Sequence, residues 1–566
     1  MFVLYCQALY LHRQKNHSST HFHYVQSQYN HHIFFEKCNL YDCHNVLLAS
    51  NRPVYDLYWQ GTGGRGMSAD DWKVIYELHE TYLSSLLTDE KKQAIALAGR
   101  YARRILLQAD IPFEVLCKIS EHFGQCSSLI ISNRFDRVYP HASFASHVLG
   151  YLSRSEKIGR SGVERVLQGA LQGQLGYVKQ VINSTGKCLS QQEYHEAVAG
   201  QDVVLTLDFQ MQTIAERIFE KDQTGAFIVM DAKTGAVRVL LSYPNFDPNA
   251  FLQPITEQAW HEKMTINNPL LNRATCSLYP PASTFKLVTV AAALEEKIVE
   301  PTSTYFCHGY VEFGGRKYAC MRRIGHGEIS LKNALVKSCN AYMYELAKRI
   351  HVDRLAVYAK RFGFGDKTNF LLPEQVGLVP TMAWKLSTYG ERIWKGEMLS
   401  IAIGQGFLTV TPLQVVRMVA SICSGNLVRP RLLESEPIVA EPVAFSSSTL
   451  HFLKDAMKEV ATSGTARLLA DVTQVQAYAK TGTAQTCSLE KAKISKDQLE
   501  HAWITGFFNH KKGGPEYAFV AMVEHVGSSR PAVELVKRFL QAYDELCVQQ
   551  PEYCSSTKKK ERDERA

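Results

Sequence analysis

The chain has 566 residues, which is too long for one ordinary core and predicts two to four folded units. Its 46% hydrophobic and 21% charged residues are typical of a globular protein, which excludes a disordered polymer and a polytopic membrane protein. The formal net charge of +8 is spread without a basic stripe, so the composition gives no indication of nucleic-acid binding.

The chain begins with an apolar stretch, residues 1–11. At about 1.5 Å per residue, a helix of this length covers only about half of a hydrocarbon core of about 30 Å. No basic segment precedes the stretch and no small-residue cleavage site follows it, so it lacks the pattern of a signal peptide. We interpret residues 1–26 as the remnant of a membrane anchor with its juxtamembrane segment. A short buried helix is the alternative.

Residues 27–198 are predicted to form an extended α+β pedestal. Apolar and polar residues alternate between Asn39 and Trp59 around a turn-like stretch at 42–45, which predicts a hairpin. Helical periodicity between about 68 and 123 predicts a helical insert. The glycines that follow indicate turns and close backbone approaches.

Residues 199–548 are predicted to form a second, α/β unit. A short strand at 203–207 leads into a helix capped by Asp208, and two apolar runs within 225–241 predict an antiparallel hairpin. Further strands at 475–478, 502–508 and 517–524 and helices at 450–460 and 532–546 complete an antiparallel sheet flanked by helices. The charged tail, residues 549–566, has the composition of a solvated segment.

A serine and a lysine three residues apart form the first candidate catalytic pair. Pro280 and Pro281 suit entry to a helix, and the residues from Ser283 to Leu294 are apolar almost all round, which predicts a buried helix with Ser283 in its first turn. The spacing places Ser283 and Lys286 on one face. Because burial disfavours the ammonium form, Lys286 could act as the general base that takes the serine proton.

Two further short patterns complete the candidate set, and each has a decoy. Ser338-Cys339-Asn340 lies between two helical stretches, and the same pattern recurs at 424–426. Lys480-Thr481-Gly482-Thr483 continues an apparent strand, whereas the Lys-Thr-Gly at 233–235 forms the turn of the predicted hairpin. Other Ser-x-x-Lys pairs begin at Ser488, Ser555 and Ser556, and we expect these to be surface accidents.

The order and contexts of the three patterns resemble those of active-site serine transpeptidases and β-lactamases. From about Asn39 to Tyr543 the chain resembles an elongation-type class B penicillin-binding protein, the penicillin-binding protein 2 class. The resemblance implies a penicillin-binding-protein/β-lactamase-like transpeptidase domain on a dimerisation, or pedestal, domain. It rests jointly on several stretches: Asn51-Arg52-Pro53-Val54-Tyr55, Arg137-Val138-Tyr139-Pro140, Gly162-Val163-Glu164, Gly404-Gln405-Gly406 and His501-Ala502-Trp503.

The resemblance implies a D,D-transpeptidase that needs no cofactor. Ser283 would attack the penultimate D-Ala carbonyl of a stem peptide, release the terminal D-Ala and hold the acyl group until an amine of a second stem takes it. Ser338 would relay a proton between the leaving amine and the lysines. Asn340 would orient the substrate amide and Lys286.

The same resemblance assigns roles to the predicted strand at 480–483. Lys480 would supply positive potential, and the hydroxyls of Thr481 and Thr483 would bind the terminal carboxylate. Gly482 would leave the strand edge open to the substrate backbone. The backbone N–H groups of Ser283 and Thr483 would form the oxyanion hole.

The expected partners also follow from the resemblance. They are peptidoglycan stem peptides ending in D-Ala-D-Ala, β-lactams that bind covalently, a SEDS-type glycosyltransferase and proteins of the elongation complex, but not nucleic acid. The expected location is the bacterial inner (cytoplasmic) membrane, with the catalytic domain on its periplasmic or outer face.

Two rival functions stay open at this point. The first is a β-lactamase or β-lactam sensor on the same fold. The sequence has no Glu-x-x-Leu-Asn stretch to supply the second base that a lactamase needs. The second is a catalytically silent scaffold that activates its glycosyltransferase, although all key side chains are present.

The fourteen cysteines include no Cys-x-x-Cys pair, which argues against a structural zinc site, and we predict no metal site. Cys307 and Cys320 flank a predicted hairpin, so they either bridge in an oxidising compartment or are two buried free thiols. Cys339 is interpreted as a packing residue. The histidines between His12 and His32 lack acidic or cysteine partners at ligand spacing.

Overall fold

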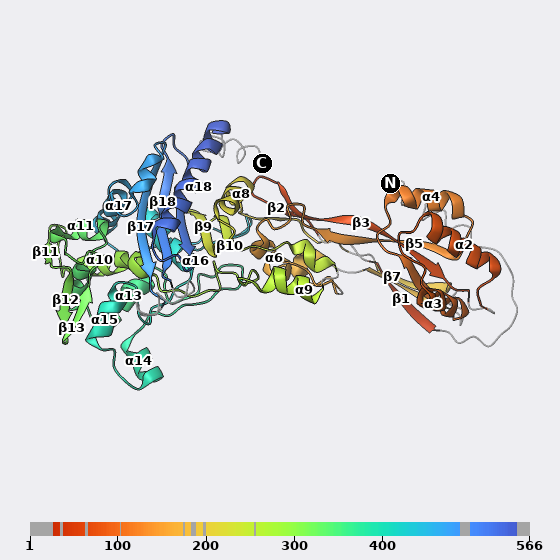
Figure 1. Cartoon of the computed structure of the whole chain (residues 1–566), viewed down its shortest axis with the longest axis horizontal. Helices are drawn as coiled ribbons and strands as arrows, with labels where there is room; N and C mark the ends of the chain where they lie inside the picture. Colours follow the sequence, from red (N-terminus) through yellow and green to blue (C-terminus); the bar gives the residue numbers. More distant parts are fainter. Residues whose placement is uncertain are drawn as a thin grey trace. The chain divides into compact units, whose positions relative to one another are not determined.

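A computed structural model describes most of the chain (Figure 1). The described residues are 27–33, 38–62, 66–101, 103–154, 156–173, 176–182, 188–195, 198, 200–253, 256–486 and 499–551. The predicted anchor, the histidine-rich stretch up to residue 26 and most of the charged tail lie outside them. Among the described residues, no helix combines the length and apolarity that a membrane crossing requires.

The chain divides into two compact units that interleave along the sequence. Unit 1 comprises residues 1–37, 51–136 and 172–200, and unit 2 comprises 38–50, 137–171 and 201–566. The predicted pedestal, 27–198, therefore contributes to both units. Within the predicted pedestal, residues 38–50, with the predicted hairpin turn, and residues 137–171, the glycine-rich stretch, belong to unit 2.

Unit 1 combines small antiparallel sheets with the predicted helical insert. Trp59, Ile75, Ile95 and Ile119 are among the buried side chains of its core, which the strands and helices of the insert share. Ser68 and Thr88 cap the first two helices. The elements are β1 (Ser27–Ile33), β6 (Gly176–Ile182), β7 (Cys188–His195), β3 (Leu47–Gln60), β4 (Arg104–Gln108), β5 (Leu129–Val138), α2 (Ala69–Thr81), α3 (Asp89–Arg100) and α4 (Phe113–Phe123).

Unit 2 is built on a five-stranded antiparallel sheet with the strand order β10-β9-β19-β18-β17. This sheet confirms the predicted hairpin and the three predicted C-terminal strands. The order places β17 at the edge, so one side of this strand is left without a partner strand in the sheet. The strands are β9 (Gly225–Asp231), β10 (Val237–Tyr243), β17 (Val475–Ala484), β18 (His501–His510) and β19 (Tyr517–Val523).

Helices cover both faces of this sheet, and each face has its own core. Ile228 and Met230 of β9 belong to one buried cluster and Phe227 and Val229 to the other, because successive strand residues point to opposite faces. The second cluster includes side chains of α8 (Phe209–Ile218) and α18 (Arg530–Gln549). The first includes side chains of α10 (Lys286–Glu295) and α16 (Pro412–Ser424), and α17 (Ser447–Thr462) contributes to both.

The remaining elements of unit 2 connect and flank these layers. The predicted N-terminal hairpin is confirmed by β2, which pairs with the start of β3, and the strand predicted at 203–207 is the short β8. They are β2 (Leu40–Tyr41), α5 (Ser146–Leu149), α6 (Gly162–Val166), α7 (Gln168–Gln172), β8 (Val203–Val204), η1 (Pro248–Leu252), α9 (Glu257–Trp260), η2 (His261–Thr265), η3 (Ala282–Phe285), β11 (Thr304–Cys307), β12 (Tyr310–Phe313), β13 (Arg316–Ala319), β14 (Gly327–Ser330), α11 (Leu331–Val336), α12 (Asn340–Ala347), α13 (Val352–Arg361), α14 (Met382–Tyr389), α15 (Lys395–Ala402), β15 (Asn426–Val428), β16 (Ala440–Pro442) and η4 (Arg467–Asp471).

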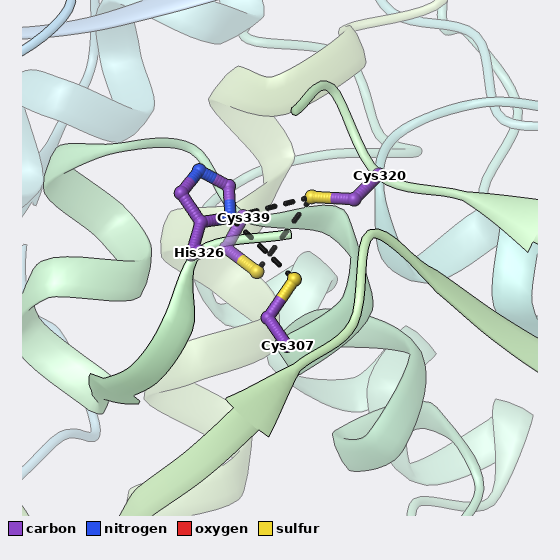
Figure 2. A group of neighbouring side chains, drawn as sticks. All are labelled: Cys307, Cys320, His326 and Cys339. Carbon is purple, nitrogen blue, oxygen red and sulfur yellow. Dashed lines mark hydrogen bonds between the residues drawn. The ribbon is translucent and has the colours of Figure 1, made fainter. Parts of the chain in front are cut away.

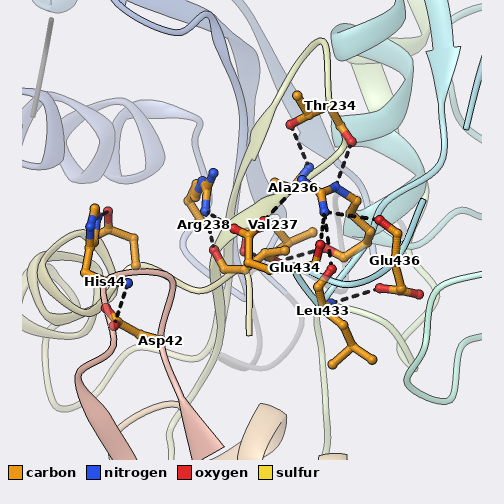
Figure 3. A network of polar contacts seen from close by, with 12 residues as sticks. Asp42, His44, Thr234, Ala236, Val237, Arg238, Leu433, Glu434 and Glu436 are labelled. Atoms are coloured by element: carbon orange, nitrogen blue, oxygen red, sulfur yellow. Dashed lines mark hydrogen bonds and ion pairs between the residues drawn. The ribbon is translucent and has the colours of Figure 1, made fainter. Parts of the chain in front are cut away.

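The decoy Lys-Thr-Gly at 233–235 is a structural turn between β9 and β10 (Figure 3). The Asp231 carboxylate accepts the Thr234 N–H at 2.8 Å. The Nε group of the buried Arg431 donates to the Thr234 carbonyl at 3.1 Å, and its Nη2 group lies 3.4 Å from the Glu434 carboxylate. The predicted hairpin turn is confirmed, and Asp231 and Arg431 hold it through hydrogen bonds to Thr234.

A fully buried ion pair stabilises the glycine-rich stretch of unit 2. The Nε group of Arg137 donates to the Glu164 carboxylate at 2.6 Å, and the two side chains are 1% and 0% exposed. The Tyr139 hydroxyl donates to the same oxygen at 3.3 Å, and Arg137 Nη1 donates to the Cys38 carbonyl at 2.7 Å. Removing one partner leaves a buried charge without compensation.

We expect Glu164→Ala to lower the free energy of unfolding by about 3–5 kcal/mol, because Arg137 then keeps an unpaired buried charge. The matched control is Glu156→Ala, which removes an exposed ion pair with Arg160 and should cost less than about 1 kcal/mol. Urea unfolding followed by fluorescence measures both values. Equal losses for the two variants would contradict the assignment of Glu164 as a buried partner.

Candidate active site

Ser283 lies in a 3₁₀ turn, η3, and α10 begins only at Lys286. The prediction of Ser283 in the first turn of an α-helix is therefore wrong in detail, but residues three apart eclipse one another in a 3₁₀ turn, so Ser283 and Lys286 still share a face. Ala282 has a φ of +51° and donates its N–H to the Gly404 carbonyl at 2.8 Å. A Cβ at Gly404 would lie 2.1 Å from the Ala282 carbonyl oxygen.

Two buried lysines share one serine hydroxyl. Lys286 Nζ lies 3.1 Å from Ser338 Oγ and also donates to the Ser338 carbonyl at 2.9 Å and to Asn340 Oδ1 at 2.6 Å. Lys480 Nζ donates to the same Ser338 Oγ at 3.1 Å. Both lysine side chains are fully buried, and Ser338 is 6% exposed. Four predicted site residues thus form one hydrogen-bonded group.

Ser338 reaches this position through a strained backbone. Its φ is +52°, a left-handed conformation that L residues other than Asn and Asp rarely adopt. Cys339 is the N-cap residue of α12, and Asn340 is the first residue of that helix. The Asn340 Nδ2 group donates to the Ala319 carbonyl at 3.3 Å, which fixes its Oδ1 atom toward Lys286. The short connection between α11 and α12 therefore presents both polar groups to the lysines.

The edge strand β17 carries Lys480 through Thr483 past the turn that holds Ser283. A Cβ at Gly482 would lie 3.2 Å from the Trp503 Cβ atom, 3.3 Å from Thr284 Cγ2 and 3.4 Å from Ala282 Cβ. The space beside this glycine is therefore taken by the domain itself. The glycine lets η3 and β17 pack closely, and its predicted role of leaving the strand edge open to the substrate backbone stays a prediction.

Two neighbouring side chains that the sequence analysis left without a role contact this strand. The Thr465 and Thr481 hydroxyls are 2.6 Å apart, and Gln405 Nε2 donates to the Thr483 carbonyl at 3.2 Å. Gln405 belongs to a stretch that supported the family resemblance, but nothing in the local sequence around Thr465 indicates a contact with Thr481, because the two are joined only by tertiary packing.

Burial lowers the pKa of both lysines. Desolvation lowers the pKa of Lys286 to about 8, and the pKa of Lys480 lies well below its ordinary value because of burial and, secondarily, the nearby Lys286 charge. Two ammonium groups around one hydroxyl repel each other in a dry site. The group is therefore poised to exchange a proton near neutral pH.

The structure places Ser283 and Thr483 at half-buried positions, at the boundary between this dry interior and solvent. The oxyanion hole formed by their backbone N–H groups stays a prediction, as do the catalytic roles of the other residues. The decoy at 424–426 spans the end of α16 and the start of β15, where Gly425 caps the helix. Ser488, Ser555 and Ser556 lie outside the described residues.

Three thiols, one of them that of Cys339, and one imidazole lie close together (Figure 2). The ligand atoms of Cys307, Cys320, His326 and Cys339, called here the thiol cluster, all lie within 4.8 Å of one another. The three cysteines are buried and unbridged, so of the two alternatives for Cys307 and Cys320 the structure has free thiols. The lack of a Cys-x-x-Cys pair did not exclude this group, because its members come from four separate segments.

The donor chemistry of the thiol cluster fits a zinc ion. In a tetrahedral site with Zn–S bonds of about 2.3 Å, neighbouring ligand atoms are about 3.7 Å apart. The Cys320 and Cys339 sulfurs are 3.7 Å apart, and His326 Nδ1 lies 3.5 Å from the Cys307 sulfur and 3.6 Å from the Cys320 sulfur. These four residues would hold the ion as a structural tie without an open position for chemistry.

Comparison with known proteins identifies the family. The chain matches the penicillin binding protein transpeptidase domain over residues 225–541 and the penicillin-binding protein dimerisation domain over residues 36–205. The chain belongs to the penicillin-binding protein family. It is similar to the peptidoglycan D,D-transpeptidase MrdA of Escherichia coli K12, with 30% identity over 449 residues, 71% of this chain and 70% of the relative.

Other similar proteins match a larger share of this chain. The MrdA protein of Acinetobacter baumannii is 29% identical over 537 residues, 88% of this chain and 79% of that protein. The penicillin-binding protein PBP2 of Helicobacter pylori, solved in complex with MreC, superposes with a TM-score of 0.79 at 27% identity, covering 92% of this chain and 99% of the other. A peptidoglycan synthase complex that coordinates polymerisation and crosslinking matches with a TM-score of 0.74 and 29% identity, covering 96% of each chain.

We expect Gly404→Ala to damage the site of this penicillin-binding protein, because the new methyl group would press on the Ala282 carbonyl beside Ser283. The matched control is Gly390→Ala: the φ angles are +76° and +71°, but a methyl group at 390 meets open space. Both variants carry about 1 kcal/mol of backbone strain. Only the first should lose labelling by a fluorescent penicillin; equal labelling would contradict this account of the turn.

Proposed function

We propose that this penicillin-binding protein is a peptidoglycan D,D-transpeptidase of cell-wall elongation that cross-links stem peptides through an acyl-enzyme on Ser283. The observation that carries the proposal is the Ser338 hydroxyl shared by the buried Lys286 and Lys480, next to the turn of Ser283. The named activity of the similar MrdA proteins supports the same reaction.

Acylation begins when the neutral form of Lys286 takes the proton of Ser283. A pKa of about 8 leaves about a tenth of Lys286 neutral at pH 7, far more than for a solvated lysine. The Ser283 oxygen then attacks the penultimate D-Ala carbonyl, and the backbone N–H groups of Ser283 and Thr483 stabilise the oxyanion. The proton travels through Ser338 to the leaving amine of the terminal D-Ala.

Lys480 acts on the carboxylate end of the donor peptide. Its lowered pKa means that burial disfavours the ammonium form of Lys480 when no carboxylate lies beside it. A bound carboxylate favours the ammonium form and raises that pKa, so positive potential develops where Thr481 and Thr483 hold the carboxylate. The hydroxyl of Thr465, 2.6 Å from that of Thr481, orients the first of these two donors.

We expect benzylpenicillin to form a stable adduct on Ser283, identified by mass spectrometry of the peptide that contains it. Ser283→Ala should remove the adduct, and Ser488→Ala, in a decoy Ser-x-x-Lys pair, should leave it unchanged. Rapid turnover of the drug without a lasting adduct would instead indicate a β-lactamase. If Ser283→Ala still restores cell shape in a depleted strain, the scaffold function is the better description.

The acylation rate should rise with pH through an apparent pKa of about 8, because only the neutral Lys286 accepts a proton. Asn340→Asp places a carboxylate where the Oδ1 atom now lies 2.6 Å from Lys286 Nζ. This favours the ammonium form and should move the rising limb to higher pH by about 1 unit or more. Stopped-flow acylation with a chromogenic cephalosporin measures the limb.

The control for this pH profile is Asn426→Asp in the decoy Ser-x-Asn pattern, which should leave the rising limb in place. A limb that stays near pH 8 in the Asn340→Asp variant as well would remove Lys286 from the role of base.

We further propose that unit 1 binds proteins of the elongation complex, including an MreC-type protein and a SEDS-type glycosyltransferase, with the catalytic unit on the outer face of the cytoplasmic membrane. The support is twofold. Similar proteins were solved with MreC and within a peptidoglycan synthase complex. Unit 1 also exposes large apolar side chains that its own core leaves uncovered: Leu97 at 54%, Tyr101 at 58% and Phe113 at 64%.

We expect Phe113→Ala to weaken binding of a purified MreC-type partner by about tenfold, as loss of a buried aromatic anchor does at an interface. Lys118→Ala, on the exposed side of the same helix, is the matched control and should bind normally. Surface plasmon resonance gives both affinities. Unchanged binding of Phe113→Ala would remove α4 from the proposed interface while leaving the transpeptidase reaction untouched.

A further inference from the structure

The segment that leads into η3 has few backbone hydrogen bonds of its own. Tyr279 exchanges two with Val410, its N–H donating at 3.0 Å and its carbonyl accepting at 2.9 Å. The prolines at 280 and 281 follow, and neither has an N–H group to donate. Ala282 then adopts its left-handed φ of +51°. A strained residue of this kind persists only where its surroundings hold it, so the turn needs an anchor outside its own backbone.

The Tyr279 side chain supplies such an anchor. Its hydroxyl donates to Glu524 Oε1 at 2.6 Å. The other carboxylate oxygen of Glu524 accepts the Arg273 Nε group at 2.9 Å. Tyr279 is buried, and the Glu524 and Arg273 side chains are 13% and 5% exposed. The phenol, the carboxylate and the guanidinium thus form a nearly buried chain of charge-assisted hydrogen bonds, which are stronger than bonds between neutral groups.

Both charged members of this chain are fixed to the central sheet. Glu524 follows the end of β19, and its N–H donates to the Thr224 carbonyl, just before β9, at 2.8 Å. The Arg273 N–H donates to Ser242 Oγ of β10 at 2.9 Å. Its guanidinium also donates to the carbonyls of residues 267 and 268, at 2.7 and 3.1 Å. The phenol hydroxyl therefore links the sheet to the turn of the nucleophile.

We propose that Tyr279 and Glu524 are positioning residues of acylation: the hydrogen bond between them ties the turn of Ser283 to the sheet and keeps the serine oxygen where it can attack. The inference rests on the proposed acyl-enzyme at Ser283 and concerns side chains that do not touch the reacting atoms.

The protonation states of the two groups suit this hydrogen bond. Burial alone would raise the pKa of Glu524, but the Arg273 charge and the Tyr279 hydroxyl bring it below its ordinary value, so the carboxylate stays ionised as an acceptor. Burial and the Glu524 charge raise the pKa of Tyr279, so its hydroxyl keeps the proton that it donates. The tie is therefore complete at neutral pH.

The carboxylate can also be reached from solvent. Glu524 and Arg273 line a cavity of about 700 Å³, together with Thr224, Asn268 and His525. Loss of the Glu524 carboxylate would leave the buried Arg273 guanidinium unpaired beside this cavity. A small carboxylate from solution should then enter the vacated space, pair with the guanidinium and accept the phenol hydrogen bond.

The first test is Tyr279→Phe, which removes one oxygen and keeps the ring that packs against His501 and Trp503. Stopped-flow acylation at saturating chromogenic cephalosporin should have a rate constant at least about tenfold lower, because the serine oxygen is no longer held in line with the reacting carbonyl. The dissociation constant of the drug before acylation should stay unchanged. Loss of folded protein would lower the amplitude of the reaction and leave its rate constant as it is, so the readout separates positioning from stability.

Tyr358→Phe is the matched control. The Tyr358 hydroxyl donates to Glu296 Oε1 at 2.7 Å, and Glu296 pairs with Arg354, so the same three groups recur at the opposite end of α10 from Ser283. This variant should acylate at the unmodified rate. Equal rate constants for Tyr279→Phe and Tyr358→Phe would overturn the proposal.

The second test restores the missing carboxylate in solution. Glu524→Ala should acylate slowly, and acetate should raise its rate constant to a plateau at constant ionic strength. Acetamide, which has the same shape without the charge, should have no such effect, and Tyr279→Phe should not respond to acetate because the donor is missing. A folded Glu524→Ala chain that ignores acetate would overturn the role of Glu524. If this variant does not fold, the comparison of the two tyrosine variants still decides.

Hydrogen exchange measures the same tie without any reaction. Peptides that cover residues 279–286 should exchange faster in Tyr279→Phe than in the unmodified chain, and Tyr358→Phe should leave them unchanged. Equal exchange in all three chains would contradict the tie. If the unmodified chain does not react with penicillin, the proposed function fails, whereas faster exchange in Tyr279→Phe would still show that the hydroxyl holds the turn.

Discussion

The active site depends on one hydroxyl that lies between two buried amines. Ser338 Oγ is 3.1 Å from the Nζ atoms of both Lys286 and Lys480, both lysine side chains are fully buried, and Ser338 is 6% exposed. In such a site two full charges are costly: burial lowers the pKa of both lysines, and the Lys286 charge lowers the pKa of Lys480 further. The neighbouring Asn340 amide and Ser338 carbonyl limit how far Lys286 can be discharged.

The rest of unit 2 shields these groups from solvent and fixes their relative positions. Lys286 is the first residue of α10, a helix with buried side chains from 286 to 293, and Lys480 projects from β17 at the sheet edge. Both sheet faces are covered, and β17, the edge strand that carries Lys480, has one side without a partner strand, where a peptide can add. Gly482 lets this edge come against η3, so the position of the nucleophile is fixed by packing between an edge strand and a 3₁₀ turn.

Local pattern was enough to predict the elements that carry the chemistry, because each has a short-range cause. The apolar run after Ser283 predicted the buried helix, and the strand before Lys480 separated the true Lys-Thr-Gly from its decoy. The 3₁₀ turn and the positive φ of Ser338 were not predictable, since tertiary contacts impose them. The Thr465 contact was missed for the same reason.

The cysteines show most clearly why spacing alone is an incomplete guide to ligand sets. Spacing rules describe ligands on one loop, whereas the thiol cluster draws its members from β11, the loop after β13, the segment before β14 and the N-cap of α12. Close backbone approach at Gly309 and Gly325 is what brings these segments together.

The short connection between α11 and α12 therefore contributes to two buried groups, the lysine pair and the thiol cluster. Ser338 and Asn340 face the lysines, and Cys339 between them faces the sulfurs, because a strained residue followed by an N-cap turns successive side chains to opposite sides. Whatever holds Cys339 also holds the two groups that control the Lys286 proton.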